Sequence, residues 1–188
     1  MNRAVLVILL VAVGSAACGQ DAPAPPAPAT SATASPAQTN SATITVTSSA
    51  FAAGAPIPEQ YSCHGANTSP PLRWSGVPSG AAALALVVDD PDAPGGTYRH
   101  WIVVNIPPTV SEVAAGAVPA GGWQLPNSNS NAAYDGPCPP SDTHHYRFTV
   151  YALRQALTLA PGTRLTQALA AIDAATLASG QLVGTFAA

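Results

Sequence analysis

The sequence contains no lysine, and its six basic residues are arginines scattered along 188 residues. Charged residues of both signs make up only 8% of the chain, against about 25% in an average soluble protein. Nucleic acids are bound through clustered Lys and Arg, so this composition excludes a nucleic acid as an expected partner. A membrane-spanning run is also missing, because the apolar run Ala4–Val13 is about half the roughly 20 residues that a bilayer requires.

The short apolar run is typical of an export signal. Arg3 gives it a basic start, and a series of small residues ends it at Ala17. Cys18 follows directly, an order that resembles the lipobox of bacterial lipoproteins, although Ser15 stands where that motif prefers an aliphatic residue. We therefore expect residues 1–17 to be a signal peptide of lipoprotein type and Cys18 to carry the lipid. The alternative is an ordinary secretory signal that is cleaved after Ala17.

Residues 18–42 consist almost entirely of Ala, Pro, Ser, Thr and Gln. Such a segment cannot bury enough apolar surface to fold, and its prolines keep it extended. We expect it to be a disordered tether that joins a membrane anchor to one folded domain, residues 43–188. The expected location is the bacterial cell envelope, with the exported protein anchored to a membrane by lipid, or periplasmic or secreted if no lipid is attached.

Apolar and alternating runs within residues 43–188 predict a mostly β domain. Five segments have the pattern of strands: Thr43–Thr47, Ala83–Asp90, His100–Ile106, Tyr146–Leu153 and Leu182–Phe186. Helical spacing of apolar residues predicts a helix over Thr163–Ser179, and a shorter helix is expected near Val110–Ala115. Many strands, few helices and proline-rich corners together indicate a mostly antiparallel β fold.

The few ionisable groups gather where the predicted strands begin or end. Residues 89–92 (DDPD) close one strand, and the proline makes a rigid corner that aims the carboxylates. His100 opens the next strand, and the proline-rich residues 135–140 lead into His144 and His145. Neighbouring side chains of a strand point to opposite faces, so at most one of these two adjacent histidines is expected to enter any one site.

Each of these groups also has a purely structural interpretation. Asp-Pro corners commonly cap turns, and a lone histidine at the start of a strand is more often a satisfied core or surface residue. Trp74, Trp101 and Trp123 are expected to be core or rim aromatics rather than site residues.

Four motifs, in this order, carry a family resemblance: DDPDAP (89–94), HWIVVN (100–105), GPCPP (136–140) and HHYRFTVYAL (144–153). Together they resemble the phosphatidylethanolamine-binding protein (PEBP) family, in particular its bacterial YbhB/YbcL branch of Raf-kinase-inhibitor-like proteins. The resemblance covers the whole expected domain. It implies a large antiparallel sheet packed on a smaller one, a few peripheral helices and a small anion pocket at the end of the sheet. The segment Gly121–Ala133 follows the family pattern only loosely.

The pocket residues of the family carry over to eight positions of this sequence. They are Asp90, Asp92, His100, Gly136, Pro137, Pro139, His144 and Tyr146. The resemblance implies that they bind a phosphoryl group, either of a small molecule or of a lipid headgroup. Chemically, imidazolium N–H groups can donate to the phosphoryl oxygens, and an aspartate can orient a histidine and raise its pKa. We therefore expect weak binding that declines as the pH rises through the histidine range, with no cofactor, no metal and no enzymatic activity.

Two other classes of function remain open. One is a hydrolase that uses Cys138 with His144 as a thiol pair, or His100, His144 and an Asp as a metal site. The other is a protein-binding module that inhibits a hydrolase or kinase, and the resemblance also allows a homodimer. Lipidation of Cys18 would leave Cys63 and Cys138 as an even pair, either joined as a disulfide or present as two free thiols. A disulfide would remove the thiol nucleophile.

Overall fold

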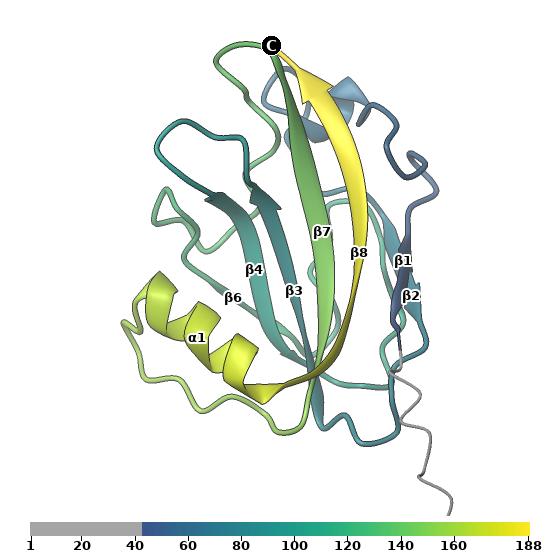
Figure 1. The fold of residues 1–188 in the computed structure, drawn as a ribbon, viewed down its shortest axis with the longest axis vertical. Coiled ribbons are helices and arrows are strands. Elements are labelled where there is room, and N and C mark those ends of the chain that lie inside the picture. Colours follow the sequence, from purple (N-terminus) through teal and green to yellow (C-terminus); the bar gives the residue numbers. More distant parts are fainter. Residues whose placement is uncertain (1–42) are drawn as a thin grey trace, which may run out of the picture. The chain divides into compact units, whose positions relative to one another are not determined.

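The computed structural model describes residues 43–188. The expected signal peptide (1–17), Cys18 and the rest of the expected tether (18–42) lie outside the described residues. The described chain forms two antiparallel sheets, of three strands in the order β1-β2-β5 and of five strands in the order β6-β4-β3-β7-β8 (Figure 1). Among these residues, no helix is both long and apolar enough to cross a membrane.

The large sheet contains β6 (Trp123–Leu125), β4 (Tyr98–Ile106), β3 (Ala83–Asp90), β7 (Thr143–Leu153) and β8 (Thr176–Ala187). The small sheet contains β1 (Thr45–Thr47), β2 (Leu72–Ser75) and β5 (Glu112–Val113). All pairs within the two sheets are antiparallel. This arrangement confirms the expected fold class.

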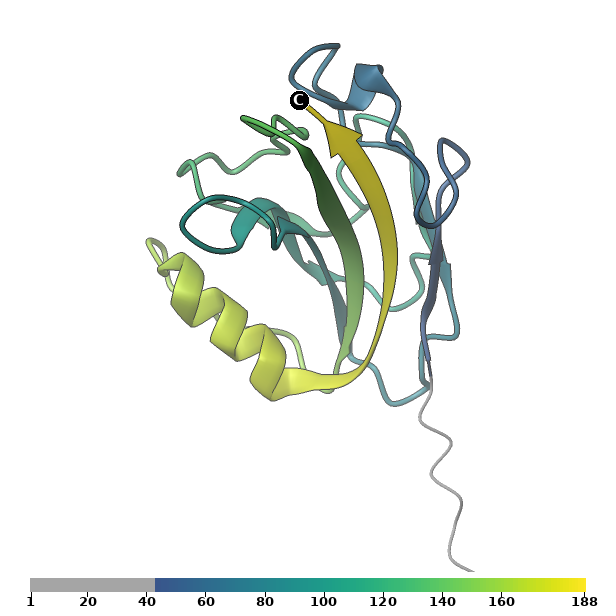
Figure 2. The same ribbon diagram turned by 45° about the horizontal axis from the view of Figure 1, so that its top comes forward.

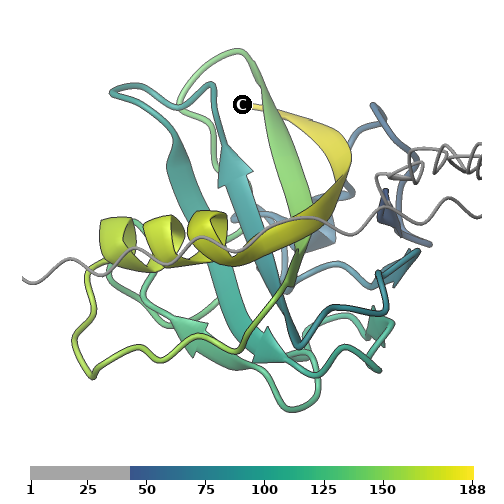
Figure 3. The same cartoon turned by 60° about the horizontal axis from the view of Figure 1, so that its bottom comes forward.

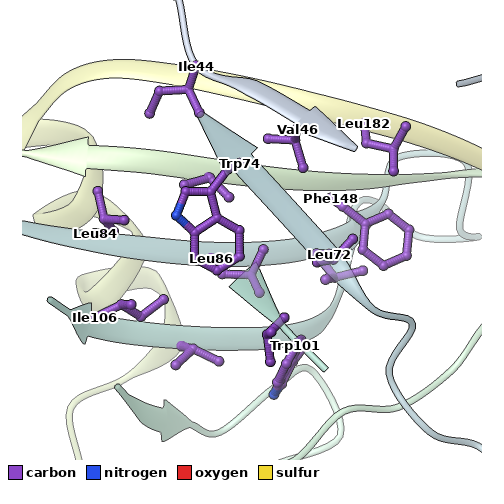
Figure 4. Close-up of a cluster of buried hydrophobic side chains, with 14 of the residues drawn as sticks. Ile44, Val46, Leu72, Trp74, Leu84, Leu86, Trp101, Ile106, Phe148 and Leu182 are labelled. Carbon is purple, nitrogen blue, oxygen red and sulfur yellow. The ribbon is translucent and has the colours of Figure 1, made fainter. Parts of the chain in front are cut away.

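The central strand β3 explains why its sequence is continuously apolar rather than alternating. All eight of its residues are buried, because both faces of the large sheet are covered. On one face, Leu84 and Leu86 pack in the same core as Trp74 of the small sheet (Figure 4). On the other face, Ala85 and Val87 belong to a second core that includes residues of helix α1.

Helix α1 (Leu165–Ala175) covers the face of the large sheet that lies opposite the small sheet (Figures 2 and 3). The predicted end at Ser179 is wrong, because the chain passes directly from Ala175 into β8 and pairs with β7 from Thr176 onward. The last predicted helical residues favour this outcome, since Thr and Ser are weaker helix formers than Ala and Leu, and Gly180 follows.

The short helix expected near Val110–Ala115 is also wrong. This segment contains β5, whose Val113 is buried and lies opposite Leu72 of β2. Tertiary pairing with the small sheet therefore overrides the weak local helical pattern. A single 3₁₀ turn, Glu59–Tyr61, is the other helical element in the described part of the chain.

Strand β8 runs along β7 from one end of the large sheet to the other. Near its beginning, Gly180 lies so close to Ile44 that a Cβ atom at position 180 would collide with the Ile44 carbonyl. Near its end, Phe186 lies opposite His144 of β7. The described chain therefore enters the domain beside the first half of β8, and β8 ends beside the first residues of β7.

Candidate functional site

A pocket of about 390 Å³ opens at the end of the large sheet where β3 ends and where β4 and β7 begin. In Figure 1 this is the end at which β8 reaches the C-terminus. Six of the eight predicted residues line it: Asp90, His100, Gly136, Pro139, His144 and Tyr146. Antiparallel pairing brings these strand ends together, which is why residues far apart in the sequence share one cavity.

An aspartate–histidine pair forms one wall of the pocket. His144 Nδ1 lies 2.7 Å from Oδ2 of Asp90, and both side chains are buried. The other oxygen of Asp90 accepts a hydrogen bond from the main-chain N–H of Asp92 at 2.8 Å. Because carboxylate oxygens accept, Nδ1 of His144 is assigned the proton, and Nε2 is the nitrogen that remains for other contacts.

Two aromatic rings provide unpaired polar atoms in the pocket. His100 Nδ1 lies 2.7 Å from the main-chain oxygen of Asp135, which can only accept, so Nδ1 carries the proton. His100 Nε2 and the Tyr146 hydroxyl are buried and have no hydrogen-bond partner among the described residues. The two ring centroids are 5.2 Å apart. Buried polar atoms are normally paired, so these two atoms are available to a water or another molecule that enters the pocket.

Burial sets the protonation of both rings. It lowers the pKa of His100 below the ordinary value, and outweighs the Asp135 hydrogen bond and the Asp90 charge, which act in the opposite direction. Burial, followed by the charge of Asp90, raises the pKa of Tyr146. At neutral pH His100 is therefore uncharged, and Tyr146 is a phenol that can donate. The nearby carboxylates do act to raise the pKa of His100, but desolvation is the larger effect and the net shift is downward.

The pocket also contains residues that the sequence did not predict, including Asn67, Tyr98, Asn129 and Asp135. The segment Gly121–Ala133 thus takes part in the pocket wall through Asn129. The conformation of this segment is held by Asn127, which is buried and does not line the pocket. The available signal was the run of asparagines and serines at 127–131, since Asn side chains hydrogen-bond nearby main chain in turns.

Asn127 uses both ends of its amide group. Its Nδ2 donates to Asp135 Oδ2 at 2.8 Å and lies within 3.3 Å of the His100 and Ala133 carbonyl oxygens. Its Oδ1 accepts from two main-chain amides, those of Asn129 and of residue 131. Asn127 therefore connects the loop to Asp135, and through the Asp135 carbonyl to the ring of His100.

Two predicted site residues, Asp92 and Pro137, do not line the pocket. Oδ2 of Asp92 accepts hydrogen bonds from the main-chain N–H of His145 at 2.8 Å and from its Nδ1 at 2.7 Å. Both side chains of this pair are about half exposed. The bond to the His145 side chain is the largest cause that lowers the pKa of Asp92. His145 thus lies outside the pocket that His144 enters, as strand alternation predicted.

Cys63 and Cys138 form a disulfide at the pocket. The Cys63 main-chain N–H donates to the Pro137 carbonyl at 3.0 Å, which is the structural role of Pro137. Of the two alternatives left open by the sequence, the structure shows the bonded pair. With both sulfurs bonded, Cys138 has no thiol to act as a nucleophile.

Residues 47–187 match the model of the phosphatidylethanolamine-binding protein family. The chain belongs to this family. Among its PEBP relatives, LppC of Mycobacterium tuberculosis, which carries a lipoprotein name, is 58% identical over 138 residues, covering 72% of this chain and 68% of LppC. The UPF0098 protein Rv1910c of the same organism is 54% identical over 139 residues, covering 73% of this chain and 67% of its own length.

Solved structures of PEBP proteins share the fold. The PEBP homologue CT736 of Chlamydia trachomatis superimposes with a TM-score of 0.73 at 41% identity, covering 78% of this chain and 99% of CT736. YbcL of Escherichia coli, described as a member of the mammalian PEBP family, also gives a TM-score of 0.73, at 33% identity, covering 77% of this chain and 98% of YbcL. The resemblance seen in the four motifs is therefore confirmed at the level of the family and the fold.

Proposed function

We propose that this PEBP-family protein is an envelope-anchored or secreted binding protein whose pocket binds a phosphoryl group attached to an amine, as in a phosphoethanolamine headgroup. The observation that carries the proposal is the pair of buried, unpaired atoms, His100 Nε2 and the Tyr146 hydroxyl, in one pocket. The lipoprotein name of LppC supports a lipid anchor. Binding rather than catalysis is proposed, because the cysteine that could act as a nucleophile is held in a disulfide.

The charge of the pocket favours an amine beside the phosphoryl group. Asp90 and Asp135 line the pocket, and none of its lining residues is an arginine or lysine. A doubly charged phosphate would therefore meet two carboxylates without a fixed positive charge, whereas an ammonium group on the same ligand can face them. Neutral His100 can accept from a protonated phosphoryl oxygen or from the ammonium through Nε2, and Tyr146 can donate to an oxygen.

The loop 136–140 offers few donors to an anion. Three of its five residues are prolines and have no N–H, and the Gly136 N–H already donates to Asn67 Oδ1 at 2.7 Å. The main-chain amide of Cys138 is the remaining donor of this loop, and it faces the Tyr146 oxygen, whose pKa it acts to lower. Because this loop supplies little positive potential, recognition of the phosphoryl group depends on the side chains of His100, His144 and Tyr146, and binding is expected to be weak.

An NMR titration of the exported form tests the proposal. The imidazole signals are followed during addition of phosphoethanolamine, inorganic phosphate or ethanolamine. Phosphoethanolamine is expected to shift the signals of His100 and His144 saturably, phosphate to do so more weakly, and ethanolamine alone not to saturate. The variant His144→Ala should lose the response. The matched variant His145→Ala should keep it, because His145 lies outside the pocket.

Either of two results would overturn the proposal. One is the absence of saturation at millimolar concentrations of every ligand. The other is an unchanged response in His144→Ala, since the ligand would then lie elsewhere. The first result would make the protein-binding alternative, with inhibition of a hydrolase or kinase, the leading explanation of the function.

A further inference from the structure

Three possible metal ligands lie together at the edge of the pocket. The sulfur atoms of Cys63 and Cys138 and a ring nitrogen of His64 are all within 4.8 Å of one another, and all three residues are exposed. Within residues 43–188, no other set of three or more His, Cys, Asp or Glu side chains has this spacing. The two sulfurs are joined in the structure, so this set is available to a metal only after the disulfide is reduced.

We propose that the reduced protein binds one Zn²⁺ through the thiolates of Cys63 and Cys138 and the imidazole of His64. Two cysteines and one histidine form a known zinc ligand set, in which a water or another ligand takes the fourth tetrahedral position. A dithiol supplies the two electrons and two protons that convert the disulfide into two thiols, and is itself oxidised to a disulfide. Zinc then replaces the two thiol protons, which are released to solvent, and the resulting site carries no net charge.

Contacts other than the disulfide hold the two cysteine segments together. The Cys63 N–H donates to the Pro137 carbonyl at 3.0 Å, and the Gly136 N–H donates to Asn67 Oδ1 at 2.7 Å. Prolines precede and follow Cys138 and restrict the main chain there. The two cysteine Cα atoms are 5.5 Å apart. Tetrahedral zinc requires its sulfurs to be roughly 3.8 Å apart, which follows from a Zn–S distance of about 2.3 Å. Rotation of the side chains after reduction can supply this separation while the main chain stays in place.

The His64 segment is held in the same way. The Ser62 hydroxyl donates to the Glu59 carbonyl at 2.7 Å and accepts from the His64 N–H at 3.1 Å. The His64 ring packs against Phe186 of β8, with ring centroids 5.6 Å apart. These contacts involve neither sulfur atom, so reduction leaves them intact. The imidazole therefore stays beside the two thiols and lowers the entropic cost of assembling the site.

Binding of metal to the exported form, reduced and oxidised, tests this site. Zn²⁺ affinity is measured by competition with a chromophoric chelator, and Co²⁺ serves as a spectroscopic substitute that reports thiolate ligation and tetrahedral geometry. Reduced protein is expected to bind one equivalent, with thiolate-to-cobalt charge-transfer bands, and oxidised protein to show none of these bands. Circular dichroism is recorded in parallel to confirm that the reduced chain keeps its β structure.

Two variants distinguish a zinc site that includes His64 from nonspecific zinc binding by the two thiols. His64→Ala keeps both thiols and should weaken Zn²⁺ binding by at least about tenfold, since loss of even an outer-shell partner of a metal ligand costs about 10–100-fold. His145→Ala, which removes another exposed histidine, should bind as the wild type does. The proposal is overturned if reduced protein does not bind zinc, if oxidised protein binds equally well, if His64→Ala has no effect, or if the reduced chain unfolds. None of these results depends on the ligand proposed for the pocket.

Discussion

The two faces of the large sheet carry contrasting polar groups at the same end of the same strands. On the pocket face, His100 and Tyr146 each leave a buried polar atom unpaired. On the helix face, the residues next to the pocket residues in sequence form an ion cluster, defined as Asp89, Arg99 and Arg147. Asp89 lies opposite both arginines in the strand register.

The ion cluster pairs its charges internally. Asp89 accepts from Arg147 Nε at 2.6 Å and lies 3.2 Å from Arg99 Nη1. The pairing is incomplete, because the buried Nε and Nη1 atoms of Arg99 make no hydrogen bond in the described part of the chain, although the Arg99 charge still faces Asp89. The comparison teaches that the groups of the helix face compensate one another's charge, whereas His100 and Tyr146 leave polar atoms that no described residue satisfies, at a cost to stability.

Removal of the central carboxylate of the ion cluster is expected to have the largest effect. Asp89→Ala leaves two partly buried arginines, on the strands that flank β3, without the carboxylate that both of them face. Breaking a fully buried pair costs about 3–5 kcal/mol, and the partial exposure of both arginines reduces the expected loss to about 2–3 kcal/mol. Urea denaturation measures the loss. The folded variant should still bind phosphoethanolamine, and a loss of binding without a loss of stability would contradict the comparison.

His100, on the pocket face, should make the stability of the protein depend on pH. The lowered pKa of His100 means that the unfolded state binds a proton more readily than the folded state. Stability is therefore greatest above the ordinary histidine pKa of about 6.5 and falls as the pH drops through that value toward the lower folded-state pKa. One proton limits the slope to about 1.4 kcal/mol per pH unit.

Chemical denaturation from pH 8 to pH 5 measures this slope, and His100→Gln should reduce it. Binding of sulfate, whose own charge stays constant over this range, should change in the opposite sense, with tighter binding as His100 gains a proton and becomes a donor. If the wild type and His100→Gln show the same change of stability with pH and the same change of sulfate affinity with pH, the burial of His100 controls neither effect.

Two tyrosines allow a matched test of paired and unpaired hydroxyls. The Tyr134 hydroxyl donates to the Tyr61 carbonyl at 2.9 Å, whereas the Tyr146 hydroxyl has no partner in the described structure. Tyr134→Phe should lose about 1 kcal/mol of stability and keep the affinity for phosphoethanolamine. Tyr146→Phe should keep or gain stability, by up to about 1 kcal/mol, and lose affinity. Thermal unfolding and titration with phosphoethanolamine check both variants. If both variants change stability and affinity in the same way, the Tyr146 hydroxyl is not an unpaired ligand-binding group.

The smallest effect is expected at Asp92. Its pair with His145 is about half exposed and lies outside the pocket. Asp92→Ala should therefore change the free energy of unfolding by no more than about 0.5 kcal/mol and leave ligand affinity unchanged. Calorimetric titration with phosphoethanolamine checks this result. A tenfold loss of affinity would place Asp92 in the binding site after all.

The sequence predicted those pocket residues that lie at or near the ends of strands. Asp90, His100, His144 and Tyr146 lie at or near the ends of buried strands, and antiparallel pairing is sufficient to bring them together. Strand alternation likewise separated His144 from His145. Asp92 could not be placed in this way, because β3 ends at Asp90 and the following turn directs the Asp92 carboxylate to His145.

Other features depend on contacts that no local pattern encodes. Asn127 acts through hydrogen bonds to main-chain atoms and to Asp135, all of which follow from the folded path of a loop. To predict the lowered pKa of His100 one must know that its side chain is buried, since its charged neighbours alone would raise the pKa. The end of helix α1 is decided by the pairing of β8 with β7, which competes with a helical pattern that extends further.

The path of β8 has a consequence for how the molecule presents its pocket. The chain enters the domain at Ile44 beside Gly180, and the pocket end of β8 is reached at Phe186, which lies opposite His144. The six residue steps from Gly180 to Phe186 along an extended strand span about 20 Å. The first described residues and the pocket therefore lie toward opposite ends of the large sheet. A ligand can therefore reach the pocket without passing the end of the domain at which the described chain begins.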